Sequence, residues 1–209
     1  MKYQIEGYYF ITDANLTRNG IIKDIKSAIR AGVKIFQYRE KNKSALFMYQ
    51  EAMEIRTLIK DGIFVINDRV DIALAVNADG VHIGQDDLPL SITRRLLGDK
   101  KIIGVTVHNC EQAIRAEKEG ADYVAVSPIF KTMTKPDAQE PVGLKILAEV
   151  KDAVSIPVVA IGGINLENVP MVVKAGADAI CAISSVITKE NPEVEIEKFQ
   201  NIFNNMEEK

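Results

Sequence analysis

The segment GADYVAVSP, residues 120–128, shows the local pattern that decides the fold of this chain. Gly120 suits the left-handed conformation that closes a helix, and the apolar run after it is too short for anything but a strand. The same joint between a helix and a strand recurs in AGVKIFQYR (31–39), DGIFVIND (61–68), ADGVHIG (78–84) and GADAICAIS (176–184). The chain is therefore built from repeated αβ units.

Three further apolar runs, FITD, IIGVTVH and IPVVAIGG, complete a set of evenly spaced strand candidates. Apolar residues at three- and four-residue spacing between them indicate helices. Repeated β–α alternation predicts a parallel sheet closed into an α/β barrel, a single (β/α)8 TIM barrel domain over residues 1–209. A doubly wound open sheet is the alternative, because strand count is easily misread from one sequence. The expected strands are residues 8–12, 34–38, 63–67, 80–83, 102–107, 122–127, 157–161 and 179–183.

The composition narrows the class of protein. Of the 209 residues 47% are hydrophobic, which suffices for one buried core, and the net charge of -3 provides no basic field for nucleic acid. The start lacks the apolar core of a signal peptide, and no apolar run reaches the roughly 18 residues of a membrane span. We therefore expect a cytoplasmic protein with small-molecule partners, with a homo-oligomer left open. Cys110 and Cys181 lack the spacing of a zinc site or a disulfide framework and are expected to be packing residues.

In such a barrel the chemistry lies where strands end, so the polar residues at these points are the candidates for a site. QYREKNKS (37–44) follows the second expected strand. Because side chains alternate across a strand, Gln37, Arg39 and Lys41 point the same way, and we expect them to form an anion site at the mouth. A solvated charged turn is the alternative.

Acidic residues follow the next two strands. INDR places Asn67 and Asp68 at the end of the third strand, and GQDD places Asp87 after the fourth. These carboxylates either neutralise the nearby cations or hold Mg²⁺, which prefers a few carboxylates with phosphate oxygens and water. Cations and metal together would indicate a diphosphate.

The last three strands supply a second group of candidates. SPIFKTMTKPD (127–137) brings Thr132, Thr134 and Lys135 to the same mouth, where they bind ligand or form an unliganded surface loop. Gly162 and Gly163 follow the seventh strand, and Ser184 and Ser185 follow the eighth. Barrels often bind phosphate through backbone N–H groups at these loops, so we expect a second anion site without metal.

The two histidines are weaker candidates. His82 lies between Val81 and Ile83 inside a strand, which is typical of a core or lumen residue with its hydrogen bonds satisfied. Thr106 and His108 end the fifth strand near the rim, but we do not expect His108 to be a catalytic base.

Taken together, these motifs resemble the thiamine-phosphate synthase family, also called thiamine-phosphate pyrophosphorylase. The resemblance covers nearly the whole chain in order, through YYFITD, QYREK, INDR, ADGVHIGQDD, GVTVH, ADYVAVSPIFKTMTKPDA, IPVVAIGGI and ISSVI. It implies a transferase that joins 4-amino-2-methyl-5-(diphosphooxymethyl)pyrimidine to thiazole phosphate, giving thiamine phosphate and pyrophosphate. In this family the diphosphate is thought to leave first, with Mg²⁺ as cofactor, before the thiazole nitrogen attacks.

The resemblance also implies roles for the candidate residues. The metal would be held by Asp68 and Asp87. The diphosphate and its pyrimidine would be bound by Gln37, Arg39, Lys41, Asn67, Thr106 and Lys135, of which Arg39, Lys41, Thr106 and Lys135 would act in catalysis. The thiazole phosphate would be bound by Thr132, Thr134, Gly163, Ile183 and Ser184.

The chain departs from the family pattern at a few positions. The family usually has Ser at Thr106, Gly at Ser127, often Pro at Lys131 and Leu at Tyr38. The rival functions are a thiazole tautomerase of the same fold, which typically carries a His in the loop where this chain reads SPIFKTMTK, and a non-catalytic phosphometabolite sensor. A Schiff-base aldolase using Lys135 is a further alternative, but a lysine beside diphosphate should stay charged.

Overall fold

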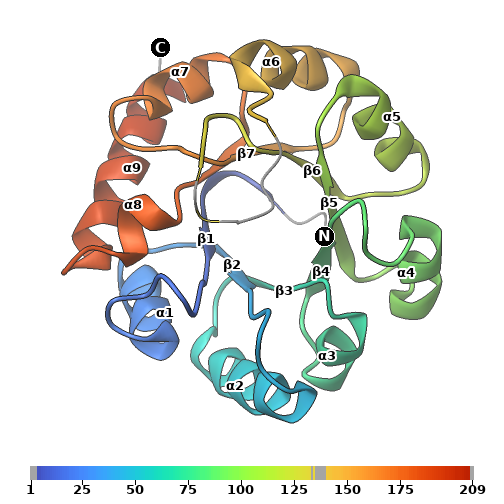
Figure 1. Ribbon diagram of the computed structural model, residues 1–209, viewed down its shortest axis with the longest axis vertical. Helices are drawn as coiled ribbons and strands as arrows, with labels where there is room; N and C mark the ends of the chain where they lie inside the picture. The colour runs from blue at the N-terminus through green and yellow to red at the C-terminus, as the bar shows by residue number, and fades with distance from the viewer. Residues whose placement is uncertain (1–3, 133, 135–139, 208–209) are drawn as a thin grey trace.

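The computed structural model describes residues 4–132, 134 and 140–207. Within them, parallel strands close into a barrel in the order β1-β2-β3-β4-β5-β6-β7-β8, and helices surround it (Figure 1). The predicted TIM barrel is therefore confirmed, and the open doubly wound sheet is wrong. None of the helices in this part of the chain is both long and apolar enough to cross a bilayer.

The predicted strands agree with the structure to within two residues at each end. The largest difference is at the last strand, which ends at Cys181 because the chain turns there into a short helix. The strands are β1 (Gly7–Ile11), β2 (Ile35–Tyr38), β3 (Ile63–Asn67), β4 (Gly80–Ile83), β5 (Ile102–Val107), β6 (Tyr123–Val126), β7 (Val158–Ile161) and β8 (Ala179–Cys181). The helices are α1 (Ile21–Arg30), α2 (Ala45–Leu58), α3 (Val70–Ala75), α4 (Leu90–Leu97), α5 (Cys110–Lys118), α6 (Gly143–Ala153), α7 (Val169–Lys174), α8 (Ser184–Ile187) and α9 (Pro192–Glu207).

Side-chain alternation along the strands divides the buried residues into two cores. One fills the barrel lumen and includes Tyr9, Val65 and Tyr123, and the other packs the outer face of the strands against the helices. On β2, Tyr38 belongs to the outer core, whereas Gln37 points inward and bonds to Tyr9. Tyr38 is thus outward, as predicted, where its hydroxyl donates to Glu51 (2.7 Å).

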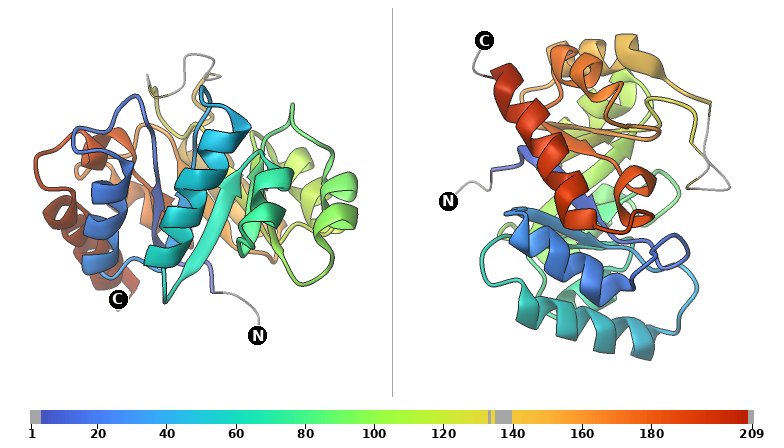
Figure 2. Two further views of the ribbon diagram at one scale, coloured as in Figure 1. Left: turned by 90° about the horizontal axis from the view of Figure 1, so that it is seen from below. Right: turned by 90° about the vertical axis from the view of Figure 1, so that its left-hand side faces the viewer.

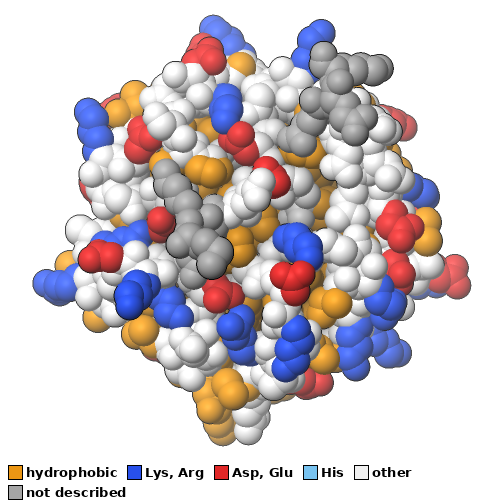
Figure 3. Space-filling model, turned by 180° about the vertical axis from the view of Figure 1, so that it is seen from behind, with side chains coloured by type: hydrophobic (Ala, Val, Ile, Leu, Met, Phe, Trp, Pro, Cys, Tyr) orange, Lys and Arg blue, Asp and Glu red, His pale blue; other side chains and the backbone are white. Residues whose placement is uncertain are grey.

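The two ends of the barrel differ. Because all strands are parallel, the segments that follow them gather at one end, as Figure 2 (left) shows at its upper edge for the loops after β1, β2 and β6. Every described residue of the predicted site belongs to that end or to the lumen below it. The opposite end, which Figure 3 views, carries basic and acidic side chains intermixed.

A repeated contact ties this opposite end together. Asp79, Asp122 and Asp178 each precede an even-numbered strand, and the carboxylate of each accepts the backbone N–H of the neighbouring strand at Phe64 (2.8 Å), Ile103 (2.8 Å) and Val158 (2.7 Å). A cation from a nearby helix completes each contact, namely Arg56, Arg94 and Lys151. The aspartates of the three Ala-Asp pairs therefore link β3 to β4, β5 to β6 and β7 to β8.

Candidate active site

Two cavities lie at the carboxyl end of the strands and share Ser127 and Thr132. The first, here called the carboxylate cavity, has a volume of about 190 Å³. Of the residues expected from the sequence it brings together Lys41, Asn67, Asp68, Asp87, Thr106 and Thr132. The second, here called the glycine cavity, is smaller at about 40 Å³ and brings together Thr132, Thr134, Gly163, Ile183 and Ser184.

Asp68 is the most constrained residue of the carboxylate cavity. It follows β3 directly, and its φ of 59° lies in the left-handed region, which only Asn77 shares among the described non-glycine residues. Its carboxylate forms an ion pair with Lys41 from the end of β2. Burial raises the pKa of Asp68; the Lys41 ammonium opposes this effect, and the neighbouring Asp87 carboxyl adds to it.

Asp68 and Asp87 are the residues that would hold a magnesium ion. Asp87 is held by the backbone N–H of Gly84, which donates to its Oδ2 (2.7 Å). No cluster of three or more His, Cys, Asp or Glu side chains suited to a metal occurs in the part of the chain that the structure describes. Two carboxylates suffice for Mg²⁺ when phosphate oxygens and water complete its shell, and a cation would relieve the repulsion between them.

Gln37 and Arg39 were expected to face the mouth beside Lys41, but in the ligand-free structure neither lines the carboxylate cavity or the glycine cavity. Gln37 is only 1% exposed inside the lumen, where its amide nitrogen donates to the Tyr9 hydroxyl (2.8 Å). Arg39 lies just past the end of β2, and its guanidinium pairs with the buried Asp13 (2.5 Å). Asp13 also accepts the backbone N–H groups of two residues, Asn15 and Leu16, in the turn that follows it. Of the three predicted anion-binding residues, Lys41 alone lines one of these two cavities.

Sequence reasoning overlooked Asp13, although a signal for it was present. It follows the first strand directly in the run FITD, at the position that marked Asp68 after the third strand. Its role as the partner of Arg39 depends on the pairing of β1 with β2, through which Ile11 lies beside Gln37.

The two glycines after β7 bring two loops together. Gly162 and Gly163 have φ values of 104° and 66°, and a Cβ at Gly163 would lie 2.7 Å from the carbonyl oxygen of Lys131. The backbone N–H groups of Ile129 and Phe130 donate to carbonyls of this turn at 2.9 and 3.0 Å. The glycines thus permit contact between the loops after β6 and β7, and the glycine cavity lies between them.

Only one of the two serines after β8 lines this cavity. Ser184 is the first residue of α8 and belongs to the cavity wall. Ser185 was expected beside it, but its hydroxyl donates to the carbonyl oxygen of Ile164 (2.8 Å). Ser185 therefore supports the loop after β7.

The loop after β6 connects the two cavities. Thr132 lines both, and its hydroxyl oxygen accepts the backbone N–H of Thr134 (3.2 Å). Ser127 also lines both, and its φ is not positive, so a serine replaces the usual glycine there without backbone strain. The predicted site residue Lys135 lies outside the described residues.

His82 occupies the lumen, as the sequence predicted. Its two ring nitrogens lie 2.9 Å from the Tyr123 hydroxyl and 2.8 Å from the Thr106 hydroxyl. At the rim, Nδ1 of His108 lies 2.6 Å from the carbonyl oxygen of Ser127. The sequence predicted Gln37 and Thr106 as site residues but not Tyr9 and Tyr123, which together with His82 connect them inside the barrel.

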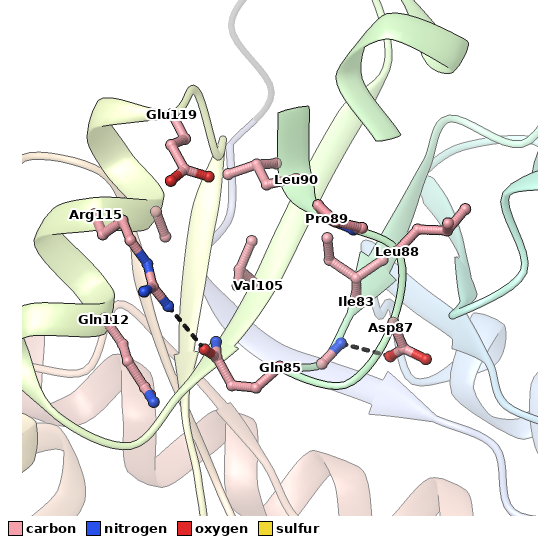
Figure 4. Close-up of a pocket in the computed structure, with 12 residues that line it drawn as sticks. Ile83, Gln85, Asp87, Leu88, Pro89, Leu90, Val105, Gln112, Arg115 and Glu119 are labelled. Carbon is pink, nitrogen blue, oxygen red and sulfur yellow. Dashed lines mark hydrogen bonds between the residues drawn. The ribbon is translucent and has the colours of Figure 1, made fainter. Parts of the chain in front are cut away.

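A third cavity of about 260 Å³ lies outside the barrel between α4 and α5 (Figure 4). Gln85 and Asp87 lie on the segment that separates it from the carboxylate cavity, because they line both. Arg115 donates to the side-chain oxygen of Gln85 (3.2 Å), and the Gln85 amide nitrogen donates to the Thr106 carbonyl (2.6 Å). The outer cavity is larger, but its polar residues hold the segment that carries Asp87.

Comparison with known proteins agrees with this arrangement. A family model described as thiamine monophosphate synthase matches residues 8–186. The thiamine-phosphate synthase of Methanosarcina barkeri (strain Fusaro / DSM 804) is 50% identical over 193 residues, which cover 92% of this chain and 88% of that protein. The thiamine-phosphate synthase of Chloroflexus aurantiacus is 49% identical over 186 residues, or 88% of this chain and 86% of that protein. The solved structure of thiamine phosphate pyrophosphorylase from Pyrococcus furiosus has a TM-score of 0.89 at 36% identity and covers 97% of both chains.

Proposed function

The chain belongs to the thiamine monophosphate synthase family, and from this premise we propose that it joins 4-amino-2-methyl-5-(diphosphooxymethyl)pyrimidine to thiazole phosphate. The products are thiamine phosphate and pyrophosphate. The family resemblance expected from the motifs is confirmed, and with it the class of enzyme, a transferase. The substrates, the metal and the order of bond changes form the proposal.

The pairing of two unlike cavities through Thr132 is the observation that carries this proposal. One cavity is lined by a lysine and three aspartates, among them the Asp68 and Asp87 pair, which suits a magnesium diphosphate. The other is lined by two threonines, two serines and a glycine turn, which suit a monophosphate without metal. A reaction between a diphosphate and a monophosphate requires two such sites side by side.

The proposed reaction breaks one bond and makes one. The bond between the pyrimidine methylene carbon and the diphosphate oxygen breaks, and its electron pair leaves with pyrophosphate. The lone pair of the thiazole nitrogen then forms the new carbon–nitrogen bond. No proton is transferred, so the site needs no general base, and its task is to stabilise the leaving charge and align the acceptor.

The position of each residue in the site suggests its share of this task. Asp68 and Asp87 would hold Mg²⁺, which neutralises charge on the departing diphosphate. Binding of that cation would release the Lys41 ammonium from its ion pair with Asp68, so that it turns to the diphosphate. Asn67 and Thr106 line the same cavity and would contact the pyrimidine diphosphate. Lys135 keeps its proposed role on the diphosphate, and Arg39 would act from its pair with Asp13.

The test is formation of thiamine phosphate by the purified chain from the two proposed substrates, with and without Mg²⁺. Product that depends on the metal supports the proposal. Isomerisation of thiazole phosphate without joining would point to the tautomerase, and binding of both ligands without reaction would point to the sensor. A cytoplasmic location remains an expectation from the sequence, and size-exclusion chromatography would give the oligomeric state.

A further inference from the structure

A chain of hydrogen bonds crosses the lumen beneath the carboxylate cavity. The Gln37 amide nitrogen donates to Tyr9 (2.8 Å), whose hydroxyl lies 2.8 Å from that of Tyr123. The Tyr123 hydroxyl lies 2.9 Å from Nδ1 of His82, and Nε2 of His82 lies 2.8 Å from the Thr106 hydroxyl. These residues come from five strands, and none is more than 9% exposed. Three residues without an expected role thus link two that are expected to bind the pyrimidine.

Counting hydrogens gives this chain a direction. Burial raises the pKa of Tyr9 and of Tyr123, so each phenol keeps one hydrogen to donate. The Tyr9 oxygen accepts from Gln37, and its own hydrogen therefore goes to Tyr123. The Tyr123 hydrogen then goes to Nδ1 of His82, which must be an acceptor. A neutral His82 carries its hydrogen on Nε2 and donates it to Thr106.

The opposite direction fails at Tyr9. If His82 carried a hydrogen on Nδ1, with or without one on Nε2, Tyr123 would have to donate to Tyr9. The Tyr9 oxygen would then accept twice, and its hydrogen would face the Gln37 amino group. Gln37 and Tyr123 are the partners of this fully buried hydroxyl in the described part of the chain. A buried donor without an acceptor is costly, so the Gln37 orientation and the His82 tautomer are coupled.

We propose that Tyr9, Tyr123 and His82 form a directional relay that makes the Thr106 hydroxyl a donor and the Gln37 amide oxygen an acceptor toward the pyrimidine. Thr106 accepts from His82 within the relay, so its own hydrogen is directed to the carboxylate cavity, which it lines. Gln37 gives its nitrogen to Tyr9, which leaves its amide oxygen as the acceptor at this end of the relay; Gln37 itself is buried in the lumen and does not line the carboxylate cavity of the ligand-free protein. The Thr106 donor and the Gln37 acceptor therefore match the edge of a heterocycle in which a ring nitrogen accepts and an adjacent amino group donates.

This inference rests on the proposed function and adds a specificity to it. A 4-aminopyrimidine presents the matching edge, with N3 as acceptor and the amino group as donor. The 4-oxo counterpart reverses both, because N3 carries a hydrogen and the oxo group only accepts. Donor would face donor at Thr106, and acceptor would face acceptor at Gln37. The relay thus excludes the deaminated pyrimidine diphosphate, and Tyr9, Tyr123 and His82 are positioning residues.

Nitrogen NMR of the histidine rings tests the relay without any substrate. The chain has two histidines, so spectra of ¹⁵N-histidine-labelled protein are simple, and the His108→Asn variant assigns them. We expect His82 to be neutral with its hydrogen on Nε2. A hydrogen on Nδ1, alone or in the imidazolium form, would overturn the inference and leave the proposed function standing.

Kinetics with the 4-amino and 4-oxo pyrimidine diphosphates test the specificity. We expect a preference of at least about 100-fold in kcat/KM for the amino compound. Tyr123→Phe should lower this ratio at least about tenfold, mainly through KM. Tyr38→Phe is the matched control, since its buried hydroxyl lies on the outer side of β2 and bonds to Glu51; its ratio should not change. A smaller preference in the unmodified enzyme, or an unchanged ratio in Tyr123→Phe, overturns the relay, whereas no turnover of either compound overturns the proposed function.

Discussion

Lys41 and Asp68, from the ends of the neighbouring strands β2 and β3, form an ion pair at the rim of the barrel. The sequence assigned them to different tasks, the lysine to an anion and the aspartate to a metal. In the ligand-free protein each satisfies the other, while Asp87 lies beside them in the same cavity. Binding of magnesium diphosphate would replace one internal pair with two external ones, metal to Asp68 and phosphate to Lys41.

Replacement of Asp68 by Asn should separate activity from stability. Removal of the metal carboxylate should lower kcat/KM at least about 100-fold, as does the loss of one strong charge-stabilising contact in other enzymes. Asn tolerates the φ of 59° better than other side chains, and loss of a charge with a raised pKa relieves an unfavourable burial. We therefore expect the ligand-free variant to melt at or above the temperature of the unmodified protein. Steady-state kinetics and thermal denaturation measure the two effects.

Asp71→Asn is the matched control for that experiment. Asp71 is exposed and pairs with Arg69 just beyond the same loop. Its replacement should leave both kcat/KM and the metal requirement unchanged. Full activity of Asp68→Asn would show that the metal assignment is wrong.

Magnesium affinity should depend on pH through Asp68. The metal needs the ionised carboxylate, and burial together with Asp87 raises the pKa of Asp68, so protons compete with the metal at a higher pH than at an ordinary aspartate. Affinity should fall by up to about tenfold per pH unit as pH decreases through that raised pKa. For stability the sign is opposite: a raised pKa favours the ligand-free fold at low pH, and this contribution is lost as pH rises through it. Calorimetric titration of Mg²⁺ alone into the ligand-free protein at decreasing pH measures the first effect, and an affinity independent of pH throughout the range in which the protein stays folded would contradict it.

Asp178 should matter for stability and not for catalysis. Its carboxylate accepts from Lys151 (2.7 Å) and from the backbone N–H of Val158 (2.7 Å) at the end of the barrel opposite the site. Replacement by Ala leaves that N–H without its acceptor and should lower the free energy of unfolding by about 2 kcal/mol. Chemical denaturation measures this loss, and kcat/KM below the melting temperature should be unchanged.

Asp61→Ala provides the comparison at the same end. Asp61 pairs with Lys34 (2.5 Å), but both side chains are largely exposed, at 84% and 61%. Exposed pairs contribute roughly 0–1 kcal/mol, so this variant should be close to the unmodified protein. Equal losses in the two variants would refute the view that Asp178 acts through the strand N–H.

The barrel could be predicted because its signals are local. A glycine and a short β-branched run recur at the joints, three of which also carry an Ala-Asp pair, and the structure shows what these parts do. Gly120 has a φ of 92°, and Asp122 accepts the backbone N–H of Ile103 on the preceding strand β5. Side-chain alternation also placed Tyr38 outside and Gln37 inside correctly. The sequence did not show how deep in the lumen Gln37 lies, because side-chain alternation gives the face of the strand and not the height along the barrel axis.

The site was harder to predict where it depends on distant contacts. The pairing of Arg39 with Asp13 could not be predicted without knowing that β1 lies beside β2. The proposed relay includes Tyr9 and Tyr123, which are more than a hundred positions apart in the sequence. The glycine turn after β7 was read as a phosphate contact, whereas the structure shows that it also makes room for the loop after β6. Each of these relations is set by the closed barrel and not by spacing in the chain.

Ser184→Ala should weaken binding of one substrate and spare the other. Ser184 lines the glycine cavity and not the carboxylate cavity. Loss of its hydroxyl should raise KM for thiazole phosphate about tenfold, the effect of one hydrogen bond to a charged group, with KM for the pyrimidine diphosphate unchanged. Ser185→Ala is the control, since that hydroxyl bonds to Ile164. An equal rise in both KM values would place Ser184 in the wrong cavity.

Gly163→Ala should disrupt the contact between the loops after β6 and β7. An added Cβ would lie 2.7 Å from the Lys131 carbonyl oxygen and 2.8 Å from the Phe130 Cβ, so the β6 loop must move, and Thr132 with it. We expect KM for thiazole phosphate to rise at least about tenfold and the free energy of unfolding to fall by about 2–3 kcal/mol. Gly32→Ala separates strain from displacement, because Gly32 has a similar φ of 78° but open space around its Cβ position, at the far end of the barrel. That control should lose only the roughly 1 kcal/mol of the left-handed backbone and keep its KM. A KM that rises equally in both variants would mean that the glycine cavity depends on overall stability and not on the approach of the two loops.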